Sequence, residues 1–229
     1  MSLSTPAFIC SFKTYPGTAD REGLDLARSL SSIHAVGSTI ELAVAPQTPD
    51  VRLLASETDR PVVAQAADAG EPGEGTGDVL VATLAAAGAD AVLVNHPERE
   101  QSIAATRTLI DRCGDHGMDA IVCVRDLTEG VAAVELGADW LLFEKPADVA
   151  SNDPLVRRHP DRVRTFIDRV RAAADTRGRE VSIAVGGGIS TAGDVATAFD
   201  LGVDAVGAAS TVVTADDPAE RLERLLADL

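Results

Sequence analysis

Eight short apolar segments recur along the chain, each five or six residues long and bounded by residues that favour turns. Several of them, including residues 91–94 and 140–143, are apolar at every position rather than at alternate positions. Continuous apolar runs of this length are typical of parallel strands that are buried on both faces. We therefore expect parallel strands at residues 7–12, 40–45, 61–65, 91–95, 119–124, 139–144, 181–186 and 203–208.

The stretches between these segments have the apolar spacing of helices. The last is the clearest, because Asp217 and Pro218 predict an N-cap and a first turn, and four leucines then share one face. A glycine that can end a helix stands just before four of the strands, at Gly88, Gly117, Gly137 and Gly202. Strand and helix thus alternate in units of about 29 residues, which predicts a closed (β/α)₈ barrel, a TIM barrel, forming a single domain over residues 1–229.

The charge of the chain limits the kinds of molecule that it can bind. It has 20 basic and 36 acidic residues, a formal net charge of −16, which argues against nucleic acid or an anionic membrane as the main partner. Lys13 and Lys145 are its only lysines, and arginine supplies the other cations. This usage is typical of a salt-rich cytoplasm or a GC-rich genome, with drift in composition as the alternative.

The three cysteines, Cys10, Cys113 and Cys123, are odd in number and lack CxxC spacing. We expect buried, reduced thiols rather than disulfides or a zinc site. No apolar run approaches the roughly 20 residues that span a bilayer, and no signal-peptide pattern opens the sequence. The sequence therefore predicts a soluble, cytoplasmic protein, and nothing in it calls for a metal or another cofactor.

Polar residues end several of the strands, at the edge where (β/α)₈ barrels carry their active sites. Lys13 follows the first strand, His96 the fourth, and Glu144 ends the sixth. A lysine, a neutral imidazole and a carboxylate on one rim can hold an anion, polarise a carbonyl and abstract a proton. The plainer alternatives are a solvated loop lysine at 13 and a solvated ion-pair partner at 144.

His96 is followed by Pro97 and Glu98, which predict the opening of a helix. The N-terminus of a helix disfavours a protonated imidazole, so His96 could donate a hydrogen bond to a substrate carbonyl. The alternative is a histidine that merely caps this helix.

Glycines and small residues follow the seventh and eighth strands, where such barrels often bind phosphate through backbone amides. A tight turn into a helix is the alternative for any one glycine run. The candidate substrate- and phosphate-binding residues are Ser11, Gly186, Gly187, Gly188, Ala209 and Ser210.

These residues carry a family resemblance, since the whole chain resembles the triosephosphate isomerases and is most similar to their short archaeal type. The matching segments occur in the family's order across nearly all of the chain, and together they are specific. They are Phe12-Lys13-Thr14-Tyr15, Val44-Ala45-Pro46-Gln47, Ala64-Gln65, Gly75-Thr76-Gly77, Asn95-His96 with Glu98, Glu144, Gly187-Gly188-Ile189-Ser190-Thr191 and Ala209-Ser210.

The resemblance implies interconversion of glyceraldehyde 3-phosphate and dihydroxyacetone phosphate through an enediolate. Glu144 would be the base, His96 the electrophile, and Lys13 the stabilising charge. It also implies a homo-oligomer, dimer or tetramer, because the family's loop around Thr76 reaches into the neighbouring subunit beside the catalytic lysine.

The chain departs from the family around the lid and the phosphate. The family has Asn at Ser11, Ser at Pro97, a glycine at Thr211, and two glycines in a lid that aligns with residues 149–152. These departures leave two further hypotheses open. One is an isomerase of another short phosphorylated sugar, and the other is a weakly active or inactive homologue that only binds a phosphorylated metabolite.

Overall fold

The computed structural model describes residues 3–33, 35–36, 39–73, 75–145 and 153–229. Its strands are parallel and belong to one eight-stranded sheet in the order β2-β1-β8-β7-β6-β5-β4-β3. The strands are β1 (Ala7–Ser11), β2 (Glu41–Ala45), β3 (Val63–Ala64), β4 (Ala91–Val94), β5 (Asp119–Val124), β6 (Trp140–Phe143), β7 (Ser182–Val185) and β8 (Ala205–Ala208).

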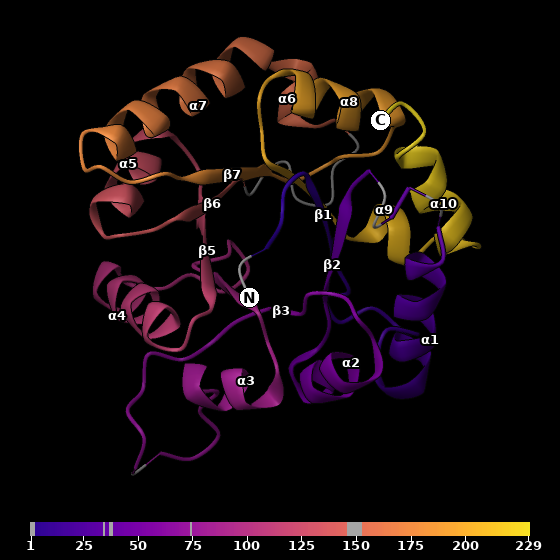
Figure 1. Cartoon of the computed structure of the whole chain (residues 1–229), viewed down its shortest axis with the longest axis horizontal. Helices are drawn as coiled ribbons and strands as arrows, with labels where there is room; N and C mark the ends of the chain where they lie inside the picture. Colours follow the sequence, from indigo (N-terminus) through magenta and orange to yellow (C-terminus); the bar gives the residue numbers. More distant parts are fainter. Residues whose placement is uncertain (1–2, 34, 37–38, 74, 146–152) are drawn as a thin grey trace.

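The two outer strands of that order, β2 and β3, meet and close the sheet. Val44 of β2 forms a parallel bridge with Val62, next to β3, and its backbone N–H donates to the carbonyl of Pro61 over 3.0 Å. The ring of strands is surrounded by helices (Figure 1). The predicted (β/α)₈ barrel is therefore confirmed, and each predicted strand is present, although the third is only two residues long.

Helices follow the strands around the outside of the barrel. Beyond β8 the chain forms the short α9 and then α10, which packs beside α1 and closes the ring of helices. The helices are α1 (Asp20–Ser31), the 3₁₀ turn η1 (Thr48–Asp50), α2 (Val51–Glu57), α3 (Val81–Ala87), α4 (Ile103–Asp115), α5 (Leu127–Glu135), α6 (Leu155–Arg158), α7 (Pro160–Asp175), α8 (Ala192–Asp200), α9 (Ser210–Val213) and α10 (Pro218–Leu225).

Local sequence signals set several helix ends as predicted. Asp217 caps α10 by accepting a hydrogen bond from the N–H of Glu220 over 3.0 Å. The four glycines expected to end helices all have positive φ, between 66° and 103°. Leu222, Leu225 and Leu226 are buried as expected, but Leu229 lies beyond the end of α10 and is 42% exposed.

Two apolar clusters fill the two sides of the sheet. One lies inside the barrel and combines alanines with a few bulky side chains, among them Ile9, Leu93, Trp140 and Leu142. The other lies between strands and helices, where the ring of Phe143 stacks on Phe166 of α7 with centroids 4.0 Å apart. Because strand side chains alternate between faces, the outward Phe143 turns the next residue toward the barrel interior.

The three cysteines are buried and free, as predicted. Burial raises the pKa of Cys10 and of Cys113 to about 12, so these thiols stay protonated at neutral pH. Among the described residues, no helix is both long and apolar enough to cross a membrane.

Candidate active site

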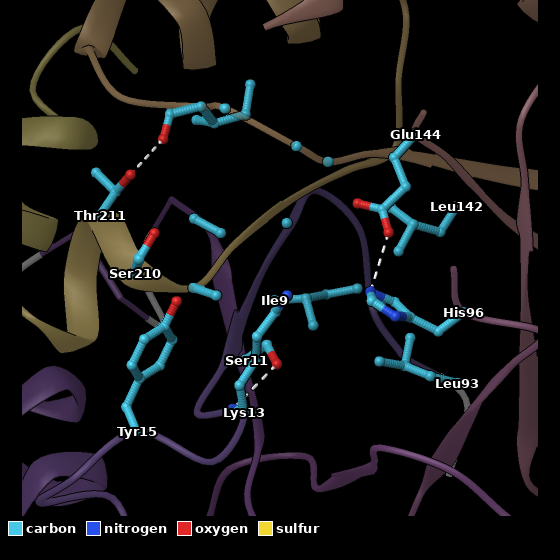
Figure 2. Close-up of a pocket in the computed structure, with 17 residues that line it drawn as sticks. Ile9, Ser11, Lys13, Tyr15, Leu93, His96, Leu142, Glu144, Ser210 and Thr211 are labelled. Atoms are coloured by element: carbon cyan, nitrogen blue, oxygen red, sulfur yellow. Dashed lines mark hydrogen bonds and ion pairs between the residues drawn. The ribbon is translucent and has the colours of Figure 1, made fainter. Parts of the chain in front are cut away.

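One pocket lies at the carboxyl ends of the strands and brings together every residue that the sequence nominated. These are Ser11, Lys13, His96, Glu144, Gly186, Gly187, Gly188, Ala209 and Ser210. His96 and Glu144 face each other on one side of the pocket, whereas Tyr15, Ser210 and Thr211 lie on the other (Figure 2). Ile9, Leu93 and Leu142 from the barrel interior also line it, so a polar rim stands over an apolar floor.

Lys13 occupies a conformation that side chains rarely adopt, with φ at +43°. The side-chain amide of Gln65 holds it there, because Nε2 donates to the carbonyl of Lys13 over 3.0 Å and to that of Ala45 over 2.9 Å. The Ser11 hydroxyl accepts a longer bond, 3.4 Å, from the N–H of Lys13. Strained backbone of this kind persists where the surroundings fix it, and it often marks a functional site.

Glu98 connects the lysine to the histidine. Its Oε2 lies 2.8 Å from Nζ of Lys13, and its backbone N–H donates to Nδ1 of His96 over 3.1 Å. The hydrogen bond from Lys13 is the main reason that the pKa of Glu98 is lowered. An Nδ1 atom that accepts a hydrogen bond carries no proton, so the ring is neutral and its N–H is at Nε2.

The predicted helix after Pro97 is absent, which corrects the sequence interpretation. Residues 97–99 form a turn in which the N–H of Arg99 donates to the carbonyl of His96 over 2.7 Å. Helix α4 begins only at Ile103, because the hydroxyl of Ser102 caps it. His96 therefore does not cap a helix, and the N–H of Glu98 takes the place of a helix N-terminus in fixing its tautomer.

Asn95 turns the chain at the end of β4 so that His96 enters the pocket. Its φ is +59°, and its side-chain amide donates to the carbonyl of Cys123 over 3.2 Å. Gln101 completes the turn, since the backbone N–H of each residue donates to the side-chain oxygen of the other. Gln101 was not predicted from the sequence, where its only local signal is a second amide six residues after Asn95.

Glu144 is buried directly after β6, with 5% of its surface exposed. Its Oε1 lies 3.1 Å from Nε2 of His96, yet among the described residues this oxygen has no partner in hydrogen-bonding geometry. A buried oxygen without a hydrogen bond is costly. Glu144 is therefore not the solvated ion-pair partner that the sequence left open, and its Oε1 remains available as a hydrogen-bond acceptor in the pocket.

Gly186 leaves the space that this carboxylate occupies. A Cβ atom at position 186 would lie 2.7 Å from Oε2 of Glu144, closer than real Cβ contacts allow. Its neighbours Gly187 and Gly188 both have φ of +76°, which favours glycine. The glycine run therefore makes room for Glu144 and shapes the loop between β7 and α8.

Two further segments, the lid and the loop around Thr76, were expected from the sequence to act beside the pocket. The lid at residues 149–152 lies outside the described residues. The segment with Thr76 is described apart from residue 74, is largely exposed, and projects away from the barrel between β3 and α3 (Figure 1). Among the described residues, no group of three or more histidine, cysteine or acidic side chains could hold a metal ion.

The fold and the pocket define a (β/α)₈-barrel protein in which a lysine, a histidine and a buried carboxylate meet at the carboxyl ends of the strands. The family model described as triosephosphate isomerase matches residues 6–226. The triosephosphate isomerase of Methanothermobacter thermautotrophicus is 34% identical over 95% of this chain and 93% of that protein. Those of Methanosarcina acetivorans and Methanobrevibacter smithii are 32% and 30% identical over 98% and 99% of this chain, and 99% and 100% of their own lengths. The chain belongs to the triosephosphate isomerase family.

Proposed function

We propose that this chain interconverts glyceraldehyde 3-phosphate and dihydroxyacetone phosphate through an enediolate, without a cofactor. The single observation that carries the proposal is the buried carboxylate of Glu144, whose Oε1 lies 3.1 Å from Nε2 of His96 and accepts no hydrogen bond from the described residues. Family membership over nearly the whole chain supports the same reaction.

Glu144 is the general base in this proposal. Its carboxylate removes a proton from one carbon of the substrate and returns it to the neighbouring carbon, which converts an aldose into a ketose. The base is buried, and the apolar side chains of Leu93 and Leu142 line the same pocket, which keeps water away from the enediolate. Oε1 of Glu144 and Nε2 of His96 are only 3.1 Å apart, so the reacting carbon and oxygen of the substrate lie alongside the two side chains, each within reach of one of them.

His96 and Lys13 stabilise the negative charge that develops on the substrate oxygens. The neutral imidazole donates from Nε2, because Nδ1 is occupied by the N–H of Glu98. The ammonium of Lys13 is held near the pocket by its 2.8 Å contact with Glu98. Preorganised donors of this type act where charge grows in the transition state.

The phosphate of the substrate binds on the opposite side of the pocket, at backbone amides near Gly187, Gly188 and Ser210. Both loops line the pocket together with Ser11, Gly186 and Ala209. Backbone amides suit this chain, because few cationic side chains line the pocket of a molecule with net charge −16.

A coupled assay tests the proposal against the two other hypotheses. Wild-type protein is given both triose phosphates and a panel of tetrulose and pentulose phosphates, with Glu144→Gln as the control. We expect triose-phosphate turnover that the substitution abolishes. Turnover of only a longer sugar phosphate would assign another isomerase reaction, and binding without turnover would indicate a protein that only holds a phosphorylated metabolite.

We further propose a cytoplasmic homo-oligomer, dimer or tetramer, adapted to high salt. The projecting segment around Thr76 supports contact between subunits, because residues 75–78 are exposed in the single chain, and the acidic composition supports a salt-rich setting. Light scattering at micromolar concentration in high salt should give a mass of at least two chains. A monomer would contradict this proposal.

A further inference from the structure

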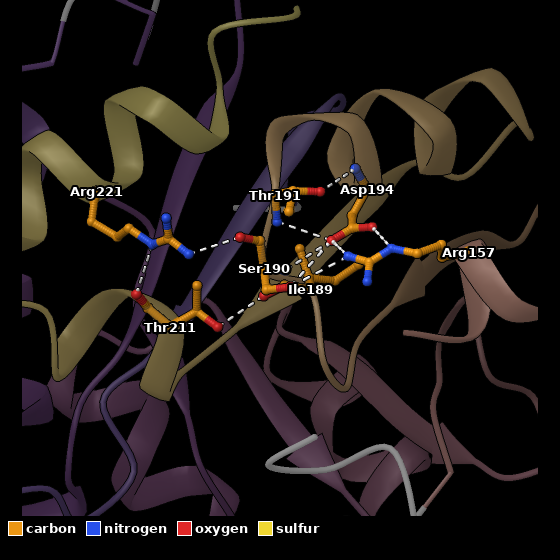
Figure 3. Close-up of polar contacts among 7 residues, drawn as sticks. All are labelled: Arg157, Ile189, Ser190, Thr191, Asp194, Thr211 and Arg221. Atoms are coloured by element: carbon orange, nitrogen blue, oxygen red, sulfur yellow. Dashed lines mark hydrogen bonds and ion pairs between the residues drawn. The ribbon is translucent and has the colours of Figure 1, made fainter. Parts of the chain in front are cut away.

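Arg221 of α10 joins the two loops that face the phosphate side of the pocket. Its guanidinium donates to the carbonyl of Ser190 over 2.7 Å and to that of Thr211 over 3.3 Å. Ser190 lies in the loop between β7 and α8, whereas Thr211 is in α9 after β8. Figure 3 shows Arg221 reaching from α10 between these segments. One side chain thus fixes the distance between two loops that are far apart in the sequence.

Thr211 adds a direct bond between the same two loops. Its hydroxyl donates to the carbonyl of Ile189 over 2.9 Å, and both residues line the pocket. Among the described residues other than glycine, positive φ occurs only at Lys13, Asp20 and Asn95. Position 211 therefore has no backbone need for the glycine that the family carries there, and the threonine supplies a connection that glycine could not make.

A separate ion pair holds the other end of the β7–α8 loop. The buried carboxylate of Asp194 accepts hydrogen bonds from the N–H groups of Ser190 and Thr191, at 3.0 and 2.9 Å. It also accepts two from the guanidinium of Arg157, at 2.9 and 2.6 Å. The charge of Asp194 is thus balanced by Arg157, on the side of the loop opposite Arg221 (Figure 3).

The charge of Arg221 is not balanced in this way. Its hydrogen bonds go to the carbonyl oxygens of Ser190 and Thr211, and no carboxylate in the described part of the chain forms an ion pair with it. Carbonyl groups carry dipoles but no net charge. A positive charge therefore remains beside the glycine loop, in a chain whose net charge is −16.

We propose that Arg221 and Thr211 are positioning residues for the phosphate group of the substrate. They hold the Gly187–Ser190 segment and the start of α9 at a fixed separation, so that amides from both loops meet one phosphate monoester, and Arg221 also raises the local positive potential. This inference rests on the proposed function for the substrate, but the anion site can be tested without turnover. Contrary to the expectation from family comparison, replacing Thr211 by glycine then weakens phosphate recognition.

The test compares Arg221→Met and Thr211→Val with wild type in two measurements. Calorimetry gives the Kd of inorganic phosphate and of glycerol 3-phosphate, and the coupled assay gives kcat and KM. Loss of hydrogen bonds and charge at Arg221 should raise Kd and KM about 10-fold, with a smaller change in kcat. Thr211→Val and Thr211→Gly should raise both by a smaller factor, and Thr211→Ser, which keeps the hydroxyl, should restore wild-type values.

Arg224→Met is the matched control, because Arg224 lies on the same helix, is exposed and pairs with Glu220. It should leave Kd and KM unchanged.

If Arg221→Met and Thr211→Val bind both anions as tightly as wild type, or lose only thermal stability, the inference is wrong even if the protein is an active isomerase. If wild type fails to turn over triose phosphates but Arg221→Met still weakens phosphate binding, the positioning role is supported and the proposed reaction is wrong. Should Arg221→Met fail to fold, the Thr211 series decides alone.

Discussion

The two sides of the pocket are built in different ways. On the side of Lys13, His96 and Glu144, the proposed chemistry depends on particular side chains, and these contact one another or Glu98. On the proposed phosphate side, the groups expected to meet a ligand are backbone amides, and the side chains of Thr211 and Arg221 connect the loops that carry them. The first side retains the family's Lys13, His96 and Glu144, although it departs from the family at Ser11 and Pro97, and the second side departs from it at Thr211.

This difference shows which parts of the site tolerate change. A general base cannot be replaced by another residue type without losing the chemistry. A backbone amide is present at nearly every position, so the phosphate side can change its side chains as long as the loops keep their separation. Substitutions on the two sides of the pocket should therefore differ in their effects.

Gly186→Ala should have a large effect on catalysis, because the new Cβ would lie 2.7 Å from Oε2 of Glu144. A base displaced by about an ångström can lose about 100-fold in rate, so we expect kcat to fall by about that factor. Gly207→Ala is the matched control within the neighbouring strand β8, since Gly207 lines the same pocket but the nearest atom to its new Cβ would be at 3.7 Å. Equal kcat values for the two variants would show that Gly186 does not place the base.

Asp194→Asn should lower stability by about 1–3 kcal/mol at neutral pH, because it weakens the bonds to Arg157 and to two backbone N–H groups. Burial alone would raise the pKa of Asp194, but the hydrogen bonds from Arg157, Ser190 and Thr191 outweigh it and lower the pKa below 3.8. A carboxyl with a lowered pKa stabilises the folded state above its unfolded pKa, and that stability is lost as pH falls through the folded value.

Thermal melts between pH 3 and 7 check this pH dependence. The difference in Tm between wild type and Asp194→Asn, here called the gap, should be largest near pH 7 and should shrink below about pH 4. Asp200→Asn, at an exposed position on the same helix, should show no such gap. A gap that stays constant down to pH 3 would mean that the charge of Asp194 does not stabilise the loop.

Much of this architecture follows from local sequence, and the parts that do not are long-range. Continuous apolar runs locate all eight strands, and the glycines before four of them end helices with positive φ. The turn after His96 was wrongly predicted as a helix, because Pro97 and Glu98 fit a first helical turn and the true cap, Ser102, lies further on.

The contacts that organise the site join residues with no sequence relation that a pattern could show. Gln65 holds Lys13 across 52 positions, and Gly186 clears space for Glu144 from another strand. Arg221 looks like an ordinary polar residue on an amphipathic helix until the barrel brings α10 next to Ser190. Such contacts depend on how the strands and helices pack, which periodicity does not specify.

Ser11→Ala should have the smallest effect of these substitutions. The hydroxyl accepts only a 3.4 Å bond from the N–H of Lys13, while Gln65 holds the same residue with a 3.0 Å bond. We expect a loss of less than about 0.5 kcal/mol, or about twofold in kcat/KM. Gln65→Leu is the comparison variant, and it should lower kcat/KM by a larger factor than Ser11→Ala. A large loss at Ser11 would assign the hydroxyl a contact with substrate.

The proposed role of Glu144 as the base can be measured directly by comparing two proteins. Wild type and Glu144→Gln are assayed with glyceraldehyde 3-phosphate, and the affinity of each for glycerol 3-phosphate is measured separately. Removal of a general base should lower kcat by about 10²–10⁴-fold, while the affinity for glycerol 3-phosphate changes little because the phosphate contacts lie across the pocket. Near wild-type turnover in Glu144→Gln, or loss of anion affinity equal to the loss of rate, would contradict the account.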